Sequence, residues 1–177
     1  MTFPFVKKIQ YPLDDYVLNA LGFGVHGIYD GKDWGIHLGE DVLRPCETLV
    51  FSIGKGRVVY SALHSGSAEK GNWGNIVIIG HKHPVTKKVF YALYGHLGTR
   101  TKNKGDKVKK GEMIGTVGKS NTSENGWWKD EHLHFSIYIG SWADKILPGY
   151  HRKEQKRTNL EDWRNPSQFI KTYDDVQ

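Results

Sequence analysis

Hydrophobic and polar residues alternate without a break from Glu131 to Ile139. A period of two is typical of a β-strand, because successive side chains of a strand point to opposite faces. One face of this predicted strand is apolar and carries Leu133, Phe135, Ile137 and Ile139. The other face is polar and carries His132, His134, Ser136 and Tyr138. The pattern predicts a half-buried strand that directs two imidazoles into the same space.

Short apolar runs separated by turn residues occupy most of the chain. They predict further strands at residues 49–53, 57–63, 75–81, 88–94 and 112–117. No long amphipathic pattern interrupts residues 36–140. Short strands joined by turns indicate an antiparallel sheet. We therefore expect a mostly β, single-domain fold, an antiparallel β-sheet sandwich with short terminal helices.

Helix signals occur only near the two ends. Asp14 and Asp15 are suited to cap a short helix that runs through Leu21. Asn165 followed by Pro166 is a typical N-cap and first helical residue, so a second short helix is expected there.

The chain is expected to divide into three stretches. Residues 1–34 form an N-terminal extension packed on the domain, residues 35–142 the core, and residues 143–177 a tail with a short helix. Within the tail, residues 151–157 are strongly charged and are expected to form a solvated loop.

Length and composition bound the class of protein. A chain of 177 residues suits one domain with a sizeable core. With 38% hydrophobic residues and a mean hydropathy of −0.55, no apolar run is long enough to span a bilayer. The N-terminal residues lack the basic and apolar segments of an export signal. The single cysteine, Cys46, excludes an internal disulfide and a cysteine-rich zinc cage, and we interpret it as a small packed residue.

The formal net charge is +6. A positive balance favours an anionic partner, such as a cell-wall polymer, a nucleic acid or a lipid surface. No recognisable nucleic-acid-binding module occurs in the sequence, so we expect no nucleic-acid partner.

Nine histidines are present, and three places single out individual ones. The first place is His37 and Asp41, four residues apart with Gly39 between them. A backbone turn at the glycine would bring the imidazole and the carboxylate to one point, and this pair of ligand types suits zinc. A turn with a solvated acid pair is the competing interpretation.

The other two places are the pair His132 and His134 and the lone His96 at the end of the strand expected at 88–94. Catalytic zinc typically has three protein ligands and one open position for water. His37, Asp41 and one of the two strand histidines supply such a set, and the spacing leaves open which one. The remaining strand histidine and His96 suit proton transfer and charge stabilisation.

Taken together, these motifs resemble the lysostaphin-like, LytM-type zinc endopeptidases that cleave bacterial cell-wall peptides. The family pattern H-x-G-x-D, Y-x-H-L and H-L-H-F stands here as HLGED (37–41), YGHL (94–97) and HLHF (132–135). The connecting segments are similar at 74–78 and 105–115, and Trp163–Pro166 resembles the closing W-x-x-P. The resemblance covers residues 35–140 well and the tail weakly, and it rests on several motifs in order.

The resemblance implies a role for each candidate residue. In the family the second histidine of H-x-H binds zinc, so His37, Asp41 and His134 are implied to hold one zinc ion per chain. The first histidine of that motif, His132, and the histidine of Y-x-H-L, His96, are implied to act on the water and the transition state.

Several positions extend or depart from the family pattern. Glu40 stands where an aliphatic residue is more usual, and its side chain is expected to point away from that of Asp41. Tyr29 is the candidate for a tyrosine that some members place near the reacting carbonyl. Asp130 or Glu131 is expected to orient a histidine, because both are adjacent to one. The loop with Trp127 and Trp128 is longer than in many members.

The predicted function is zinc-dependent hydrolysis of peptide bonds in bacterial peptidoglycan by a monomeric enzyme in the cell envelope or outside the cell. The absence of an export signal leaves an intracellular or lysis-released origin open. The alternative is a catalytically inactive wall-binding or hydrolase-activating domain of the same type, but all five functional positions are filled. A biotinyl or lipoyl carrier is a third hypothesis, because residues 105–118 resemble the carrier hairpin; it leaves the histidines unexplained.

Overall fold

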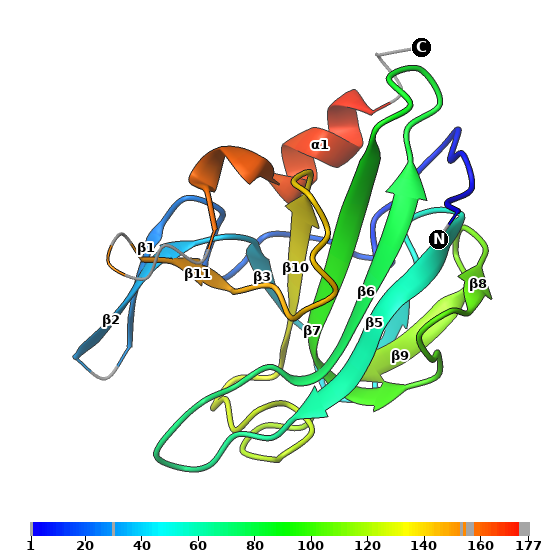
Figure 1. Ribbon diagram of the computed structural model, residues 1–177. Coiled ribbons are helices and arrows are strands. Elements are labelled where there is room, and N and C mark those ends of the chain that lie inside the picture. Colours follow the sequence, from blue (N-terminus) through cyan, green and yellow to red (C-terminus); the bar gives the residue numbers. More distant parts are fainter. Residues whose placement is uncertain (1, 30, 153, 155–157, 174–177) are drawn as a thin grey trace.

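A computed structural model describes residues 2–29, 31–152, 154 and 158–173. The strands are β1 (His26–Tyr29), β2 (Lys32–His37), β3 (Glu40–Leu43), β4 (Leu49–Phe51), β5 (Gly56–His64), β6 (Gly74–Lys82), β7 (Val89–Arg100), β8 (Lys107–Val108), β9 (Met113–Val117), β10 (His132–Tyr138), β11 (Tyr150–His151) and β12 (Trp163–Arg164). A 3₁₀-helix covers Leu160–Asp162, and α1 covers Pro166–Thr172. The named strands all pair antiparallel, which confirms the expected mostly β fold (Figure 1).

The larger sheet has nine strands in the order β12-β10-β7-β6-β5-β8, with β3 beside β10 and the β4–β9 pair beside β7. Strand β7 is longer than the sequence pattern predicts, and it changes partner along its length. It pairs with β10 as far as Gly95 and with β9 from Leu97 onward. His96 lies at this change of partner and has a positive φ of 61°. The positive φ breaks the regular strand conformation at the position where the family motif places a histidine.

The central strands are buried on both faces. In β6, Val77 and Ile79 belong to the main core, whereas Ile76 and Ile78 pack into a second cluster on the opposite face. Strand β10 is also buried along its whole length, so the prediction of a half-buried strand was wrong. Its polar face is enclosed because β2 and the loop that carries Trp128 lie against it.

A second, three-stranded sheet has the order β1-β2-β11 and lies to one side of the larger sheet (Figure 1). The strands expected from the sequence begin at residue 49, so the β1–β2 hairpin was missed. Strand β11 comes from the tail and pairs with the end of β2, Tyr150 opposite His37. Segments from the N-terminal and C-terminal parts of the chain, β2 and β11, therefore pair beside a candidate site residue. The boundary expected between residues 34 and 35 falls inside β2, and the three-part division stays a prediction.

The N-terminal helix expected from Asp14 to Leu21 is absent, and this stretch runs as turns and extended chain. Tertiary hydrogen bonds explain the difference. The Asn19 side chain accepts from the Leu43 backbone N at 2.8 Å, and the Asp41 backbone N donates to the Leu21 carbonyl at 2.9 Å. These bonds cover the free edge of β3, and they outweigh a weak helix preference.

The C-terminal helix forms as the sequence predicts. The Asn165 side chain caps it by accepting from the Gln168 backbone N at 2.9 Å, and Pro166 is its first residue. Of the charged run 151–157, residues 153 and 155–157 lie outside the described residues. No helix in the described part of the chain is long and apolar enough to cross a membrane.

Candidate metal centre

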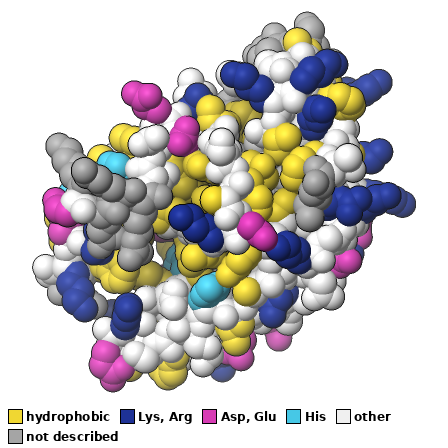
Figure 2. Space-filling model, in the orientation of Figure 1, with side chains coloured by type: hydrophobic (Ala, Val, Ile, Leu, Met, Phe, Trp, Pro, Cys, Tyr) yellow, Lys and Arg dark blue, Asp and Glu magenta, His cyan; other side chains and the backbone are white. Residues whose placement is uncertain are grey.

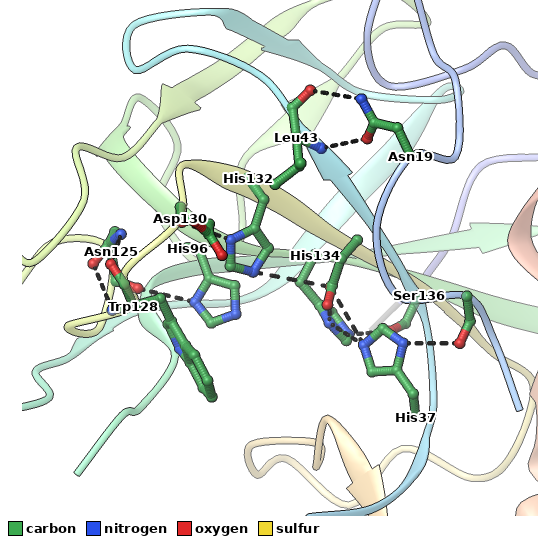
Figure 3. Close-up of polar contacts among 12 residues, drawn as sticks. Asn19, His37, Leu43, His96, Asn125, Trp128, Asp130, His132, His134 and Ser136 are labelled. Carbon is green, nitrogen blue, oxygen red and sulfur yellow. Dashed lines mark hydrogen bonds and ion pairs between the residues drawn. The ribbon is translucent and has the colours of Figure 1, made fainter. Parts of the chain in front are cut away.

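Three side chains from three strands converge beside the middle of β10. His37 ends β2, Asp41 lies in β3, and His134 lies opposite Asp41 in β10. The Asp41 Oδ1 atom lies 2.9 Å from His134 Nδ1 and 3.3 Å from His37 Nε2, and the two ring nitrogens are 3.0 Å apart (Figure 3). The structure thus brings together the three residues that the sequence predicts as metal ligands.

The turn between β2 and β3 makes this convergence possible. Gly39 lies in the turn, and a Cβ atom there would come within 2.5 Å of Ser136 Oγ and 2.7 Å of His134 Nε2. Only a glycine lets the turn approach β10 this closely. The close approach places the residues on either side of the turn, His37 and Asp41, against the same histidine.

Burial and pairing set the charge states of Asp41 and His134. Burial alone would raise the pKa of the Asp41 carboxyl, but hydrogen bonds with His134 and His37 hold it well below its usual value. Burial lowers the pKa of His134 to about 4, although Asp41 opposes the shift. An ionised Asp41 carboxylate and a neutral His134 imidazole are the states in which these two groups bind a metal.

The donor set fits a divalent metal ion of the zinc type. The three ligand atoms lie within 4.8 Å of one another, and the three residues are buried. On a tetrahedral zinc with bonds of about 2.0–2.2 Å, ligand atoms lie roughly 3.3 Å apart. The separations found here, 2.9 to 3.3 Å, are close to that value. Three ligands would leave one position open to substrate or water.

Each ligand imidazole has a partner on its other nitrogen. His37 Nδ1 lies 3.2 Å from the Gly22 carbonyl oxygen and so carries the hydrogen, which leaves Nε2 free as a ligand atom. His134 Nε2 lies 2.7 Å from Ser136 Oγ, which leaves Nδ1 for the metal. Partners of this kind fix the ring orientation and the tautomer of metal-binding histidines. Ser136 and Gly22 were not identified from the sequence.

His96 and His132 lie next to the cluster, with ring centroids 4.6 Å apart. His96 Nδ1 donates to the Asn125 carbonyl at 3.0 Å, and His132 Nδ1 donates to the Asp130 carbonyl at 2.8 Å (Figure 3). In both rings Nε2 is therefore the nitrogen without a hydrogen. The two groups share a tautomer that suits the acceptance of a proton.

The expected role of Asp130 and Glu131 needs correction. Asp130 does hold His132, but through its backbone carbonyl and not its carboxylate. The Glu131 carboxylate turns away and accepts from the Cys46 backbone N at 2.7 Å and the Ser120 backbone N at 3.3 Å. The Glu131 carboxylate therefore joins the segment before β4 to the loop after β9, and it does not orient His132.

Asn125 fixes the loop that supplies the carbonyl to His96. Its side chain is fully buried, donates to the Trp128 carbonyl at 3.0 Å and accepts from the Trp128 backbone N at 3.1 Å. A Cβ atom on Gly118 would come within 2.7 Å of the Asn125 Cβ, so a glycine there admits the side chain. Sequence reasoning missed Asn125, because an asparagine in a loop rich in polar residues carries no signal of burial.

A groove of about 1170 Å³ leads to the cluster. Aromatic side chains line much of it, and they contact one another: Trp128 lies with its ring centroid 5.4 Å from that of Trp34, 6.0 Å from Tyr29 and 5.6 Å from His96. In the space-filling view the surface is hollowed between the three-stranded sheet and the loops at the lower edge (Figure 2). The Trp127–Trp128 loop thus forms one wall of the groove.

Two tyrosines face this groove. Tyr29, the candidate from the sequence, lies against Trp128, whereas Tyr150 lies with its ring centroid 5.1 Å from His37. Burial, reinforced by the charge of Asp41, raises the pKa of Tyr150 above its ordinary value, so its hydroxyl stays protonated. Tyr150 was missed because it belongs to a two-residue strand in a tail without a clear pattern.

Glu40 points away from Asp41, as expected for neighbours in a strand. Its buried carboxylate accepts from the Tyr16 hydroxyl and from Ser167 Oγ, both at 2.7 Å. It therefore joins the N-terminal segment to β3 and the start of α1. This contact gives a structural reason for a carboxylate where the family pattern has an aliphatic residue.

Comparisons with known proteins agree with this geometry. The sequence pattern of peptidase family M23 matches residues 35–145. An uncharacterised lipoprotein, YgeR of Escherichia coli (strain K12), is 30% identical over 109 residues, which are 62% of this chain and 37% of that protein.

Two solved structures have similar folds. A zinc-containing peptidase from Vibrio cholerae has a TM-score of 0.58 and 27% identity over 75% of this chain and 37% of its own. The catalytic domain of lysostaphin from Staphylococcus simulans has a TM-score of 0.56 and 24% identity over 86% of this chain and 90% of its own. The present chain thus spans little more than a third of the lipoprotein and of the Vibrio peptidase.

Proposed function

The chain belongs to peptidase family M23, and from this premise we propose that it is a zinc-dependent endopeptidase that hydrolyses peptide bonds of bacterial peptidoglycan. One observation carries the proposal. His37, Asp41 and His134 meet at one point, with two further histidines beside them at the end of an aromatic groove. The relatives add support, because lysostaphin and the Vibrio protein are both described as peptidases.

In this proposal His37 Nε2, Asp41 Oδ1 and His134 Nδ1 hold one zinc ion. Bound zinc would supply a Lewis acid that polarises a carbonyl group and lowers the pKa of a water molecule. The protein holds the two histidine ligands in their binding orientation, since the Gly22 carbonyl and the Ser136 hydroxyl hydrogen-bond to the ring nitrogens that face away from the metal position.

His96 and His132 are proposed to move protons. His96 accepts a proton at Nε2 as the water attacks the peptide carbonyl, and it later returns a proton to the departing amine. The buried ring is stable in the neutral form, because burial above all, and then the closeness of the other ionisable rings His132 and His134, keeps its pKa well below the usual value. His132 Nε2 lies 4.0 Å from Asp41 Oδ1, and the ring, once protonated at Nε2 as well as Nδ1, is placed to donate to the negative charge that develops on the substrate oxygen.

Tyr150, and not Tyr29, is proposed as the tyrosine near the reacting carbonyl. Its protonated hydroxyl, on a ring whose centroid lies 5.1 Å from that of His37, is proposed as a further donor to the substrate carbonyl oxygen. Tyr29 then serves as part of the groove wall.

The test is digestion of purified peptidoglycans that differ in cross-link chemistry, with mass analysis of the fragments. We expect release of peptides with one new amino terminus per cut, about one zinc per chain, and loss of cleavage after treatment with a chelator. An inactive wall-binding or activating domain would bind the polymer and release nothing. We place the activity in the cell envelope, where peptidoglycan lies.

A further inference from the structure

Strand β2 carries a bulge at Trp34, three residues before the strand ends at the candidate ligand His37. Gly27 pairs with Gly35 and Ile28 pairs with Asp33, so Trp34 is an extra residue without a partner in β1. Gly35 has a positive φ of 91°, which only glycine adopts easily. Bulges re-aim side chains, and here the Trp34 ring lies in the groove wall, 5.4 Å from Trp128 and 5.8 Å from Tyr150.

Arg152 is fixed against this re-aimed tryptophan. Its Nε donates to the Trp34 carbonyl at 2.8 Å, and its Cζ lies 5.4 Å from the centroid of the Trp34 ring. Gly35 makes room for the arginine, because a Cβ atom there would come within 2.9 Å of Arg152 Cγ. Two contacts thus orient the guanidinium plane while the side chain lines the groove.

Within the part of the chain that the structure describes, the charge of Arg152 has no partner of opposite charge. No carboxylate of the described residues forms an ion pair with it, whereas Asp33 and Asp41 pair with histidines. Nε is occupied, and the two Nη groups remain for a ligand in the groove. A guanidinium with both Nη groups available matches the two oxygens of a carboxylate.

We propose that Arg152 binds a carboxylate of the substrate peptide close to the bond that is cut. This inference rests on the proposed peptidase function and adds a substrate class, an anionic peptide. Arg152 follows Tyr150 by two residues, and two residues of extended chain span about 7 Å. Since Tyr150 contacts His37, the carboxylate belongs about two residues from the reacting carbonyl of an extended substrate.

A purely structural role for Arg152 is the competing explanation, because its Nε joins β11 to β2. The two explanations differ in one respect. Loss of a structural support weakens cleavage of every substrate alike, whereas loss of a carboxylate ligand removes the preference for acidic over neutral substrates. The two explanations are therefore distinguished by whether the Arg152 substitution changes the ratio of cleavage rates for acidic and neutral substrates.

The experiment uses the full chain and a synthetic peptide that spans the bond cut in the peptidoglycan digestion. The peptide is made with every carboxylate free, with the acidic side chain amidated, and with the terminal carboxylate amidated, so that the source of the carboxylate is identified. We expect kcat/KM of the unsubstituted protein to fall about tenfold for one of the amidated forms. Arg152→Ala should cleave all three forms equally, at the rate that the unsubstituted protein shows for the poorer one.

Binding measured by calorimetry gives a second readout that does not depend on turnover. The same tenfold preference for the free acid should appear in Kd and disappear in Arg152→Ala. Lys129→Ala, which removes one positive charge from another residue that lines the groove, is the matched control and should keep the preference. Equal cleavage and binding of all forms by the unsubstituted protein would overturn the proposal for Arg152 and leave the peptidase function standing. A failure to cut any peptidoglycan would instead overturn the proposed function.

Discussion

Two buried histidines at opposite ends of the β6–β7 pair are alike in almost every local property. His81 at one end and His96 at the other each donate Nδ1 to a backbone carbonyl, at 2.9 and 3.0 Å. Burial lowers the pKa of both rings. The difference is in what surrounds Nε2: His81 stacks on Phe90 inside the core, whereas His96 lies at the groove beside His132.

This difference teaches that burial and a shifted pKa do not identify a functional histidine. His81 Nε2 is buried without a hydrogen-bond partner among the described residues, so a substrate cannot reach this nitrogen. His96 gains its significance from convergence with groups that other strands and loops supply. The predictions below test that contrast, from the largest expected effect to the smallest.

Replacement of a ligand should have the largest effect. His134→Ala removes one of three donor atoms, so we expect loss of bound zinc and a fall in turnover of more than about a thousandfold. Metal analysis and a peptidoglycan digestion assay measure the two quantities. His81→Leu is the matched control at the other end of the strands and should keep both. If it lost zinc as well, the contrast between the two ends would fail.

The pH dependence of stability should report His81. Its pKa is about 4 in the folded protein and about 6.5 when exposed. Between these two pH values His81 binds a proton in the unfolded chain but not in the folded chain. The free energy of unfolding therefore falls as the pH is lowered from 6.5 towards 4, by about 3 kcal/mol.

His81→Leu should flatten this part of the stability curve, as measured by urea unfolding at pH 7 and pH 4.5. A variant that loses as much stability on acidification as the unsubstituted protein would contradict the assignment. The substitution removes the donor to the Lys55 carbonyl in both conditions, so that cost cancels in the comparison.

Glu40 shows that a buried polar group beside the centre can serve the fold alone. Glu40→Ala leaves the Tyr16 hydroxyl and Ser167 Oγ without their acceptor and should lower the free energy of unfolding by about 2 kcal/mol. Glu40→Gln keeps one acceptor oxygen for both donors and should recover most of that loss. Equal destabilisation by both variants would show that the two hydrogen bonds do not stabilise the fold.

The loop beneath His96 should have the smallest effect. Asn125→Ala removes both bonds to the Trp128 backbone, so the carbonyl that orients His96 loses its support. We expect kcat to fall about tenfold while zinc content stays unchanged. Ser123→Ala in the same loop is the matched control and should behave as the unsubstituted protein. A rise in KM with an unchanged kcat would indicate a role in the groove wall instead.

Much of this organisation was predictable from local patterns. The alternation from residue 131 to 139 predicts β10, and Asn165 with Pro166 predicts α1. The resemblance of three short motifs to the lysostaphin-like family predicts the five site residues as a group, and the structure places them together.

The remainder depends on contacts that no local pattern records. Asn19 pairs with the edge of β3 rather than entering a helix, because the edge offers unpaired backbone groups. Tyr150 and Arg152 reach the groove through a two-residue strand whose partner lies more than a hundred residues earlier. His96 and His132 are oriented by the backbone carbonyls of Asn125 and Asp130. A search for functional side chains overlooks backbone groups of this kind.

The central claim is that metal binding and proton transfer belong to different histidines. His96→Asn tests it most directly, because asparagine tolerates the positive φ at this position and cannot act as a base at neutral pH. Zinc content and turnover on peptidoglycan are measured on the same preparation. We predict a zinc content equal to that of the unsubstituted protein and turnover reduced by about 10²- to 10⁴-fold. Normal turnover, or loss of the zinc, would contradict the account.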